Sequence, residues 1–482
     1  MGATACGPAP AAKPPAAQAA APVVQPTESL PTGPPRKDLS DLLEPPAAAP
    51  QSRPPQARPT LDAPDLLANI DERKVAAEGI RRLTGRRLVL YTDLPARREI
   101  EELPELFDQA FPQWCAFFGV DPAKDDQWQA VGCLMADKAR FERAGLLPNA
   151  LPPFANGYSV GRCLWLYDQT SPYYRRHLLL HEGVHAFMDT LLPAGGPPWY
   201  VEGLAELLGT HSWQDGRLEL GIFPASADDV PRLGRVEMIQ KALAAGKALN
   251  LTQVLAFGPR AHLEVEPYAW CWAATALLDR SPDTHAAFRE VVRAAQKDRV
   301  PRDLAALDPR GDLQLAERWQ LFVADLDYGY DFERMQTDLS PATGKFVAAP
   351  RQVSVRADRG WQNSGLRVEA GRHYRIAARG RFQIAAEREQ PPSKPAVWWS
   401  EPGGVTLRYY RGRPLGELLA AIRPDDFNVE RELTPLAQPQ PVGLGGEFTP
   451  PRSGTLFFKL NDAPGQLADN AGEVEVEVSP AP

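Results

Sequence analysis

The most constraining feature of this sequence is the uneven distribution of its prolines. It separates an N-terminal segment, which has too few apolar residues to form a core, from the rest of the chain. Of the 50 prolines in the 482-residue chain, 15 fall within residues 1–60. That segment is otherwise rich in Ala, Gln, Ser and Thr, and the first aromatic residue of the chain is Tyr91. Such a composition buries too little apolar surface to offset the entropy lost on ordering. We therefore predict that residues 1–64 form a disordered Pro/Ala-rich tether.

The first seven residues, Met1 to Gly7, resemble the end of a bacterial lipoprotein signal, in which small residues precede a lipidated cysteine. If so, Cys6 carries a lipid anchor, and we expect an exported protein that is periplasmic, displayed on the cell surface or secreted. The alternative is a start site with an incidental cysteine, and the sequence leaves both open. No charged-then-apolar signal segment is visible, and no apolar run approaches 18 residues, so no transmembrane helix is expected.

Length and charge limit the architecture and the partners. A chain of 482 residues is long enough for two or three domains. Its formal net charge of −8 provides no general electrostatic reason to bind nucleic acid or an anionic membrane. We therefore expect no nucleic-acid partner, and membrane attachment only through a lipid at Cys6.

The pattern of apolar residues changes along the chain from mixed to purely β-type. Strand-like runs at 87–92, 131–135 and 159–167 are combined with amphipathic helical patterns at 65–82 and 96–118. Helical patterns then dominate as far as residue 325. After residue 350, short β-type runs are separated by Gly, Pro and Asn; they lie at 352–356, 372–378, 380–385, 404–410, 454–460 and 473–478. We predict a multidomain protein with an α+β domain over 65–348 and an all-β sandwich over 349–482.

The strongest chemical signal is the pentapeptide His181-Glu182-Gly183-Val184-His185. Residues i and i+4 lie on one face of a helix, so both imidazoles reach a single zinc ion. Glu182 projects beside them, where it accepts a proton from the metal-bound water. The apolar residues that flank the motif indicate a buried helix, in which two imidazoles and a carboxylate need partners. A metal ion supplies such a partner.

A zinc ion held by two histidines needs a third protein ligand. The turn at 193–198 is expected to end the motif helix and to send the next helix back along it. That second helix begins with Trp199-Tyr-Val-Glu202-Gly-Leu-Ala-Glu206. Glu202, 17 residues after His185, is predicted to be the third ligand. Glu206 follows one helical turn later, where it is expected to hydrogen-bond a ligating histidine from behind.

The HExxH motif followed by W-x-x-E-G-x-A-E resembles the gluzincin metallopeptidases, specifically the peptidase-MA-like families, over residues 85–330. The resemblance implies a zincin-like domain that binds zinc through His181, His185 and Glu202. It also implies Glu182 as the general base that activates a zinc-bound water to hydrolyse a peptide bond.

That family usually has a tyrosine or histidine that stabilises the oxyanion. Tyr268 and His211 are the candidates here, and for each the alternative is ordinary packing. His177, one turn before His181, is predicted to be a helix-start residue rather than a ligand.

A second motif lies near the end of the chain, in the loop at 461–472. Its side-chain and carbonyl oxygens, with turns set by Gly and Pro, suit a hard cation such as Ca²⁺, although a solvated hairpin turn has the same composition. The string N-D-x-P-G-x-x-x-[DN]-N-x-G resembles the PA-IL-like galactose-binding calcium lectins, which are small jelly-roll sandwiches. The resemblance extends over about 352–480 and implies sugar hydroxyls on a calcium ion held by Asp462, the Gln466 carbonyl, Asp469 and Asn470.

The sequence departs from this lectin pattern in one respect that concerns the sugar. No histidine occurs after His373, so the sugar-contacting histidine of that family is missing. Trp398 is a candidate to stack on a sugar ring instead. Because neighbouring residues of a strand point to opposite faces, however, one of Trp398 and Trp399 is expected to lie in the core.

Taken together, these motifs predict an exported zinc metallopeptidase, acting on a peptide or protein, with a lectin-like sandwich that binds a glycan or a surface. The alternative is a carbohydrate-binding or adhesion protein that carries a catalytically inactive zincin scaffold.

Overall fold

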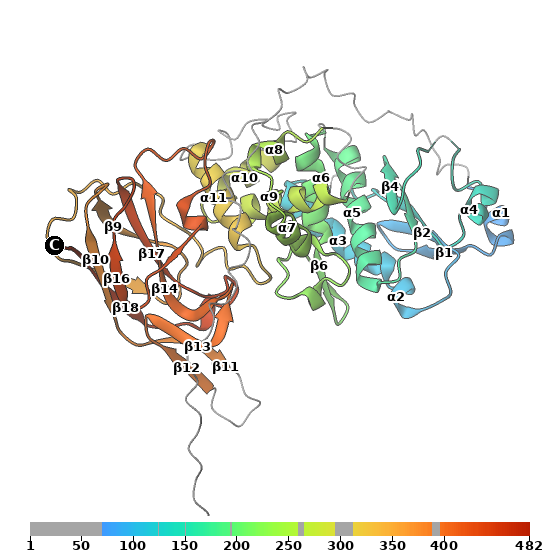
Figure 1. Cartoon of the computed structure of the whole chain (residues 1–482). Coiled ribbons are helices and arrows are strands. Elements are labelled where there is room, and N and C mark those ends of the chain that lie inside the picture. The colour runs from blue at the N-terminus through green and yellow to red at the C-terminus, as the bar shows by residue number, and fades with distance from the viewer. Residues whose placement is uncertain are drawn as a thin grey trace, which may run out of the picture.

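The computed structural model describes residues 70–482 except 124, 150, 193–194, 259–264, 295–311 and 388–395. The predicted tether at 1–64, with Cys6, lies outside the described residues. The described chain is a multidomain α+β protein with several β-sheets. Most of its helices lie between a mixed sheet and the C-terminal strands (Figure 1). Within the described ranges, every helix is too short or too polar to cross a membrane.

A five-stranded mixed sheet begins the described chain, with strand order β1-β2-β3-β5-β4. Its inner strands β2, β3 and β5 run parallel, and both edge strands are antiparallel to their neighbours. The strands are β1 (Arg81–Thr84), β2 (Leu88–Thr92), β3 (Ala130–Met135), β4 (Gly157–Val160) and β5 (Cys163–Tyr167). The strands predicted at 87–92 and 131–135 are confirmed, whereas the run at 159–167 is a hairpin that turns at Gly161, where φ is 54°.

The first helices pack on this sheet and carry the HExxH motif. They are α1 (Glu72–Ala77), α2 (Arg98–Glu101), α3 (Leu103–Phe118), α4 (Lys138–Ala144), α5 (Pro172–Leu191) and α6 (Pro198–Gly209). The helix predicted at 65–82 is wrong at its C-terminal end. Gly79, with a φ of 69°, follows the end of α1, and Arg81–Thr84 pairs with β2 instead.

In the described residues after α6, the helical part continues with a hairpin and five α-helices. These elements are β6 (His211–Gln214), β7 (Arg217–Leu220), α7 (Arg235–Ala244), α8 (Leu251–Leu255), α9 (Glu266–Arg280), α10 (His285–Ala294) and α11 (Asp312–Asp325). Glycines allow the central helices to approach closely. A Cβ at Gly183 would lie 2.7 Å from the rings of Phe107 and Trp114, and one at Gly203 would lie 2.8 Å from the carbonyl oxygen of Cys271. These contacts fix α5 against α3 and α6 against α9.

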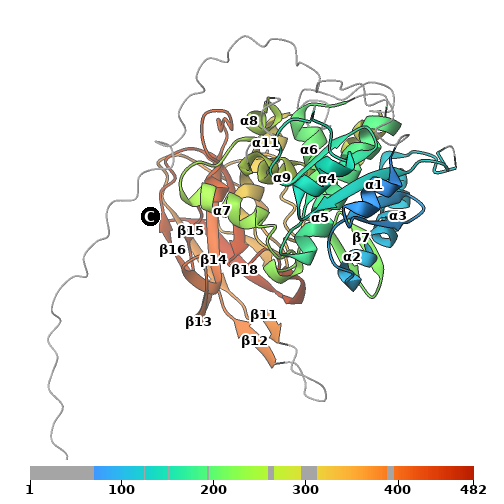
Figure 2. The same cartoon turned by 90° about the vertical axis from the view of Figure 1, so that its right-hand side faces the viewer.

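The C-terminal part consists of two antiparallel sheets, ordered β16-β10-β18-β8 and β13-β14-β17-β9, and a separate β11–β12 ribbon. Tyr374 and Val476 of one sheet share a core with Leu418 and Phe458 of the other, so the sheets pack face to face. The ribbon projects beyond them (Figures 1 and 2). The strands are β8 (Arg351–Arg356), β9 (Gln362–Val368), β10 (Tyr374–Arg379), β11 (Phe382–Glu387), β12 (Ala396–Ser400), β13 (Gly403–Tyr410), β14 (Arg413–Pro424), β15 (Gln440–Pro441), β16 (Gly445–Phe448), β17 (Gly454–Leu460) and β18 (Glu473–Pro480).

Helix α11 joins the helical part to the sandwich. The Arg423 guanidinium of β14 lies 2.9 Å from the carboxylate of Glu317, and the Lys459 ammonium of β17 lies 3.2 Å from that of Asp325. Leu321, between these two acids, belongs to an apolar cluster with side chains of β14 and β17. The two parts therefore meet in a buried interface that combines ionic and apolar contacts.

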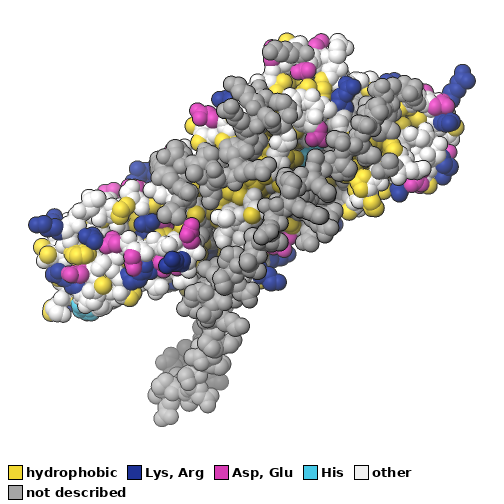
Figure 3. All heavy atoms as spheres, turned by 90° about the horizontal axis from the view of Figure 1, so that it is seen from above, with side chains coloured by type: hydrophobic (Ala, Val, Ile, Leu, Met, Phe, Trp, Pro, Cys, Tyr) yellow, Lys and Arg dark blue, Asp and Glu magenta, His cyan; other side chains and the backbone are white. Residues whose placement is uncertain are grey.

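The surface carries charges of both signs. Seen from above, dark blue and magenta side chains are interspersed at both ends of the molecule (Figure 3). This distribution agrees with a chain whose 53 basic and 61 acidic residues leave a modest net charge.

Candidate metal centres

The HExxH motif lies in the middle of α5, which is buried over most of its length. The helix begins with Pro172, and the Ser171 hydroxyl accepts a hydrogen bond from the Tyr174 amide at 3.3 Å. Such a cap satisfies one of the free amides at a helix start. His181 and His185 are 5% and 2% exposed, so neither imidazole is solvated by bulk water.

Three donor atoms from α5 and α6 converge at one point. His181 Nε2 and His185 Nε2 lie 3.1 Å apart. Glu202 Oε2 lies 3.1 Å from His185 Nε2 and 3.5 Å from His181 Nε2. The structure thus brings together the three residues predicted as zinc ligands, and these atoms come from two helices that pack against each other.

This donor set fits a zinc ion. Two imidazoles and a carboxylate are a common set for a zinc site that leaves a position open for water or substrate. The surroundings also favour positive charge. Burial alone would lower the pKa of His181, but the carboxylates of Glu202 and Glu206 outweigh this effect and raise the pKa to about 10. Burial alone would raise the pKa of Glu202, but the two histidines outweigh it and hold the pKa well below its usual value. A buried centre that draws a proton onto an imidazole also suits a bound cation.

Glu182 follows His181 on α5, and its carboxylate lies against the edge strand β4. Its Oε2 accepts a hydrogen bond of 2.8 Å from the Ser159 hydroxyl. On the same strand, a Cβ at Gly157 would come within 2.6 Å of Glu182 Oε1. The carboxylate therefore occupies space that exists only because residue 157 has no side chain.

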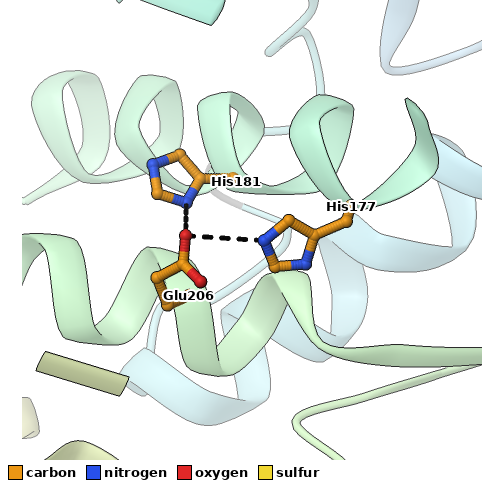
Figure 4. A group of neighbouring side chains, drawn as sticks. All are labelled: His177, His181 and Glu206. Carbon is orange, nitrogen blue, oxygen red and sulfur yellow. Dashed lines mark hydrogen bonds and ion pairs between the residues drawn. The ribbon is translucent and has the colours of Figure 1, made fainter. Parts of the chain in front are cut away.

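Glu206 contacts His181 from the side away from Glu202, and it also contacts His177. Figure 4 shows His177 and His181 on α5 facing the same carboxylate oxygen of α6. Glu206 Oε1 lies 3.1 Å from His181 Nδ1 and 3.5 Å from His177 Nε2. His177, predicted as a helix-start residue, is instead in the second turn of α5 and fully buried, so that prediction is wrong.

The two oxyanion candidates differ in their surroundings. The Tyr268 ring lies 5.7 Å from the His181 ring, and burial together with the charges of Glu202 and Glu182 raises the pKa of its hydroxyl. His211 is stacked on Tyr173 at 4.6 Å. Its Nδ1 lies 2.8 Å from the Gly209 carbonyl, and its Nε2 accepts from Arg176 at 3.2 Å. Burial lowers the pKa of His211 to about 3, which matches a neutral ring with both nitrogens engaged.

The predicted calcium ligands lie in and around the 3-10 helix η6 (Leu467–Asp469), which follows Gln466. Asp462 and Asn470 are buried and in contact, since the Asn470 amide donates to Asp462 Oδ2 at 2.7 Å. Burial raises the pKa of Asp462 to about 7, and Asp469 adds to this shift. Oxygens Oδ1 of Asp469 and Oδ1 of Asn470 are buried and lack a hydrogen-bond partner among the described residues. Unpaired buried oxygens of this kind are what a hard cation binds.

The two adjacent tryptophans of β12 point in different directions. Trp398 packs against the core of the sandwich, whereas Trp399 is 50% exposed. Trp399 pairs with Gln383 of β11, whose side-chain amide donates to the carbonyl oxygen of Asp469. Directly paired residues of antiparallel strands lie on one face of the ribbon. Trp399 therefore lies on the ribbon face that meets the Asp469 loop.

We compared the chain with known proteins. No protein-family model matches it, and no curated protein does. Among solved structures it is similar to one described as "EclA N-terminal domain; PllA-like lectin", with 23% identity and a TM-score of 0.19, over 27% of this chain and 95% of that one. Another is IMPa from Pseudomonas aeruginosa in complex with an O-glycopeptide, with 15% identity and a TM-score of 0.15. That match covers 82% of this chain and 46% of the IMPa chain, so this chain spans about half its length.

Three residues at the helical site were not found by the sequence analysis. Ser159 and Gly157 contact Glu182 from β4, and Arg235 contacts Glu206 from α7. They lie 22 to 50 residues away from the motif, and no local pattern relates them to it. Ser159 and Gly157 could have been identified only from the position of β4 against α5.

Proposed function

We propose that the helical part of this protein is a zinc-dependent peptidase. The observation that carries this proposal is the convergence of His181 Nε2, His185 Nε2 and Glu202 Oε2 within 3.5 Å. An accidental cluster of two buried imidazoles and a carboxylate would be costly, because each group loses hydration. A cation that binds all three removes that cost.

When bound, zinc supplies a Lewis acid that polarises the scissile carbonyl and acidifies water. Glu182 then accepts the proton of the attacking water and returns it to the leaving amine. Ser159, at 2.8 Å, holds the carboxylate in position by donating to Oε2. Tyr268 is the better candidate to donate a hydrogen bond to the developing oxyanion, because its ring lies 5.7 Å from that of His181, whereas His211 Nε2 accepts a hydrogen bond from Arg176.

A Glu182→Gln variant tests the catalytic part of this proposal. We expect it to retain zinc at the wild-type ratio, because Glu182 is outside the ligand set, and to lose at least about 1,000-fold in cleavage of a casein or peptide panel. The matched control is Glu99→Gln, which removes a partly exposed carboxylate from α2. Zinc-loaded wild type that cleaves nothing, or cleaves no faster than Glu182→Gln, would instead favour the inactive scaffold of an adhesion protein.

We further propose that the sandwich binds calcium at Asp462, Gln466, Asp469 and Asn470 and uses it to hold a glycan. The unpaired buried oxygens of Asp469 and Asn470 favour this second function. The exposed indole of Trp399, on the ribbon face that meets the same loop, offers an apolar surface to a sugar ring.

Calcium and glycan binding can be tested separately. Calcium is expected to raise the melting temperature of wild type but not of Asp462→Ala, and an unchanged wild type would remove the calcium proposal. On a glycan array, Trp399→Ala should lose signal that is calcium-dependent in wild type. Tyr409→Ala is the matched control, since Tyr409 is 60% exposed on β13. An array without binders would favour a sandwich that serves only intramolecular packing.

A further inference from the structure

Arg235, the first residue of α7, contacts the carboxylate behind the zinc ligands. Its guanidinium is 5% exposed, with Nε 2.8 Å from Glu206 Oε2 and Nη2 3.1 Å from Glu206 Oε1. Two parallel contacts of this kind fix both the position and the plane of a carboxylate. Glu206 thus has its orientation set by α7 as well as by its own helix.

The cluster of His177, His181 and Glu206 has two physical interpretations. Its donor atoms lie within 4.8 Å of one another, so it resembles a second metal centre. A cation there would face the Arg235 guanidinium across the same carboxylate, in a buried region where like charges repel strongly. Arg235 already occupies both oxygens of Glu206, which excludes the second metal and leaves a positioning role.

We propose that Arg235 is a positioning residue of the zinc site: it holds Glu206 against His181 Nδ1 and thereby directs His181 Nε2 toward the metal. This inference rests on the proposed zinc site. A carboxylate that accepts from Nδ1 fixes the ring orientation and leaves the other nitrogen as the donor to the metal.

The geometry of the contacts supports this role. Glu206 Oε1 lies 3.1 Å from His181 Nδ1, and the same carboxylate is held through both oxygens by Arg235. The helix that carries Arg235 is itself held in place. Glu237, two residues further along α7, accepts a hydrogen bond of 2.6 Å from the Tyr328 hydroxyl.

Zinc affinity measures the effect, with the full chain and zinc alone as the probe. In competition with a chelator, Arg235→Met is expected to weaken zinc binding by about 10- to 100-fold, and Arg235→Lys by less, because the charge remains. Arg175→Met is the matched control, since Arg175 is equally buried on α5 and pairs with Asp168 at 2.6 Å. It should leave zinc affinity within twofold of wild type.

Zinc affinity of a folded Arg235→Met within twofold of wild type would overturn the inference. If Arg235→Met does not fold, an Arg235→Lys variant with wild-type zinc affinity would also overturn it. If wild type binds no zinc, the proposed zinc site is wrong. The role of Arg235 is then tested by crystal structures of metal-free wild type and of the Arg235→Met variant. We expect Glu206 to move beyond hydrogen-bond distance of His181 in the variant, and an unchanged contact would contradict the positioning role.

Discussion

Glu182 lies against the backbone of Gly157, where a Cβ would come within 2.6 Å of its Oε1. We predict that Gly157→Ala displaces this carboxylate and lowers peptidase activity by about 100-fold, the effect of a displacement near 1 Å. The obstructed atom is the end of a flexible side chain, so stability and zinc content should change little. Gly195→Ala, where a Cβ meets open space, should keep wild-type activity. Equal activities of the two variants would show that Gly157 does not place the base.

The Asp462 carboxyl makes stability of the calcium-free protein depend on pH. Burial raises its folded pKa to about 7, above the ordinary value of 3.8. A carboxyl with a raised folded pKa contributes stability when protonated, and this contribution is lost as pH rises from about 4 through 7. Asp462→Asn should therefore gain stability relative to wild type as pH rises from 5 to 8 without calcium. Thermal melts at both pH values measure this, and a constant difference would contradict it.

At the scale of elements, the sequence predicts what depends on local spacing. The HExxH histidines share a face of α5 because of helical periodicity, and Glu202 was expected from the need for a third ligand. Contacts such as Ser159 to Glu182 depend on how β4 lies along α5, which no spacing encodes. For β12, alternation predicted that one tryptophan faces the core, but it does not say which; the one that packs against the core, partly buried, is Trp398.

Gly203 determines how closely α6 approaches α9. A Cβ there would lie 2.5 Å from Thr275 Cγ2 and 2.8 Å from the Cys271 carbonyl oxygen, which is backbone and unable to move aside cheaply. We predict that Gly203→Ala costs about 1–3 kcal/mol of stability. It should also lower zinc affinity, because Glu202 precedes this residue. Gly258→Ala, in open space, is the control. Chemical denaturation measures the first effect, and a variant as stable as the control would contradict it.

At the scale of the whole molecule, the interface between α11 and the sandwich connects the two candidate sites. The loop at 461–472, which holds the proposed calcium site, contacts the segment after α11, because the Asp331 amide donates to the Pro464 carbonyl at 3.1 Å. A Cβ at Gly465 would lie 2.6 Å from the carbonyl oxygen of Tyr328. The Tyr328 hydroxyl in turn donates a hydrogen bond to Glu237 of α7. We therefore expect the helical part and the sandwich to unfold together.

The pair of Asp325 and Lys459 tests this cooperative unfolding. Both residues are buried, so Asp325→Leu leaves an unpaired ammonium in the interface and should cost about 3 kcal/mol. For one unfolding unit of about 400 residues, that cost corresponds to a melting temperature lower by roughly 3–4 °C in one transition. Asp426→Leu breaks a more exposed pair with Arg452 and should cost no more than about 1 kcal/mol. Two separate transitions in wild-type calorimetry, with only one moved by Asp325→Leu, would contradict a shared unfolding unit.

The zinc content of the purified protein tests the central claim most directly. Elemental analysis should find one zinc ion per chain in wild type and close to none in Glu202→Gln, because the carboxylate that faces both histidines is lost. His285→Gln, a partly exposed histidine of α10 outside the donor set, should retain the metal. Wild type without zinc after incubation with the metal, or Glu202→Gln with as much zinc as wild type, would contradict the proposed centre.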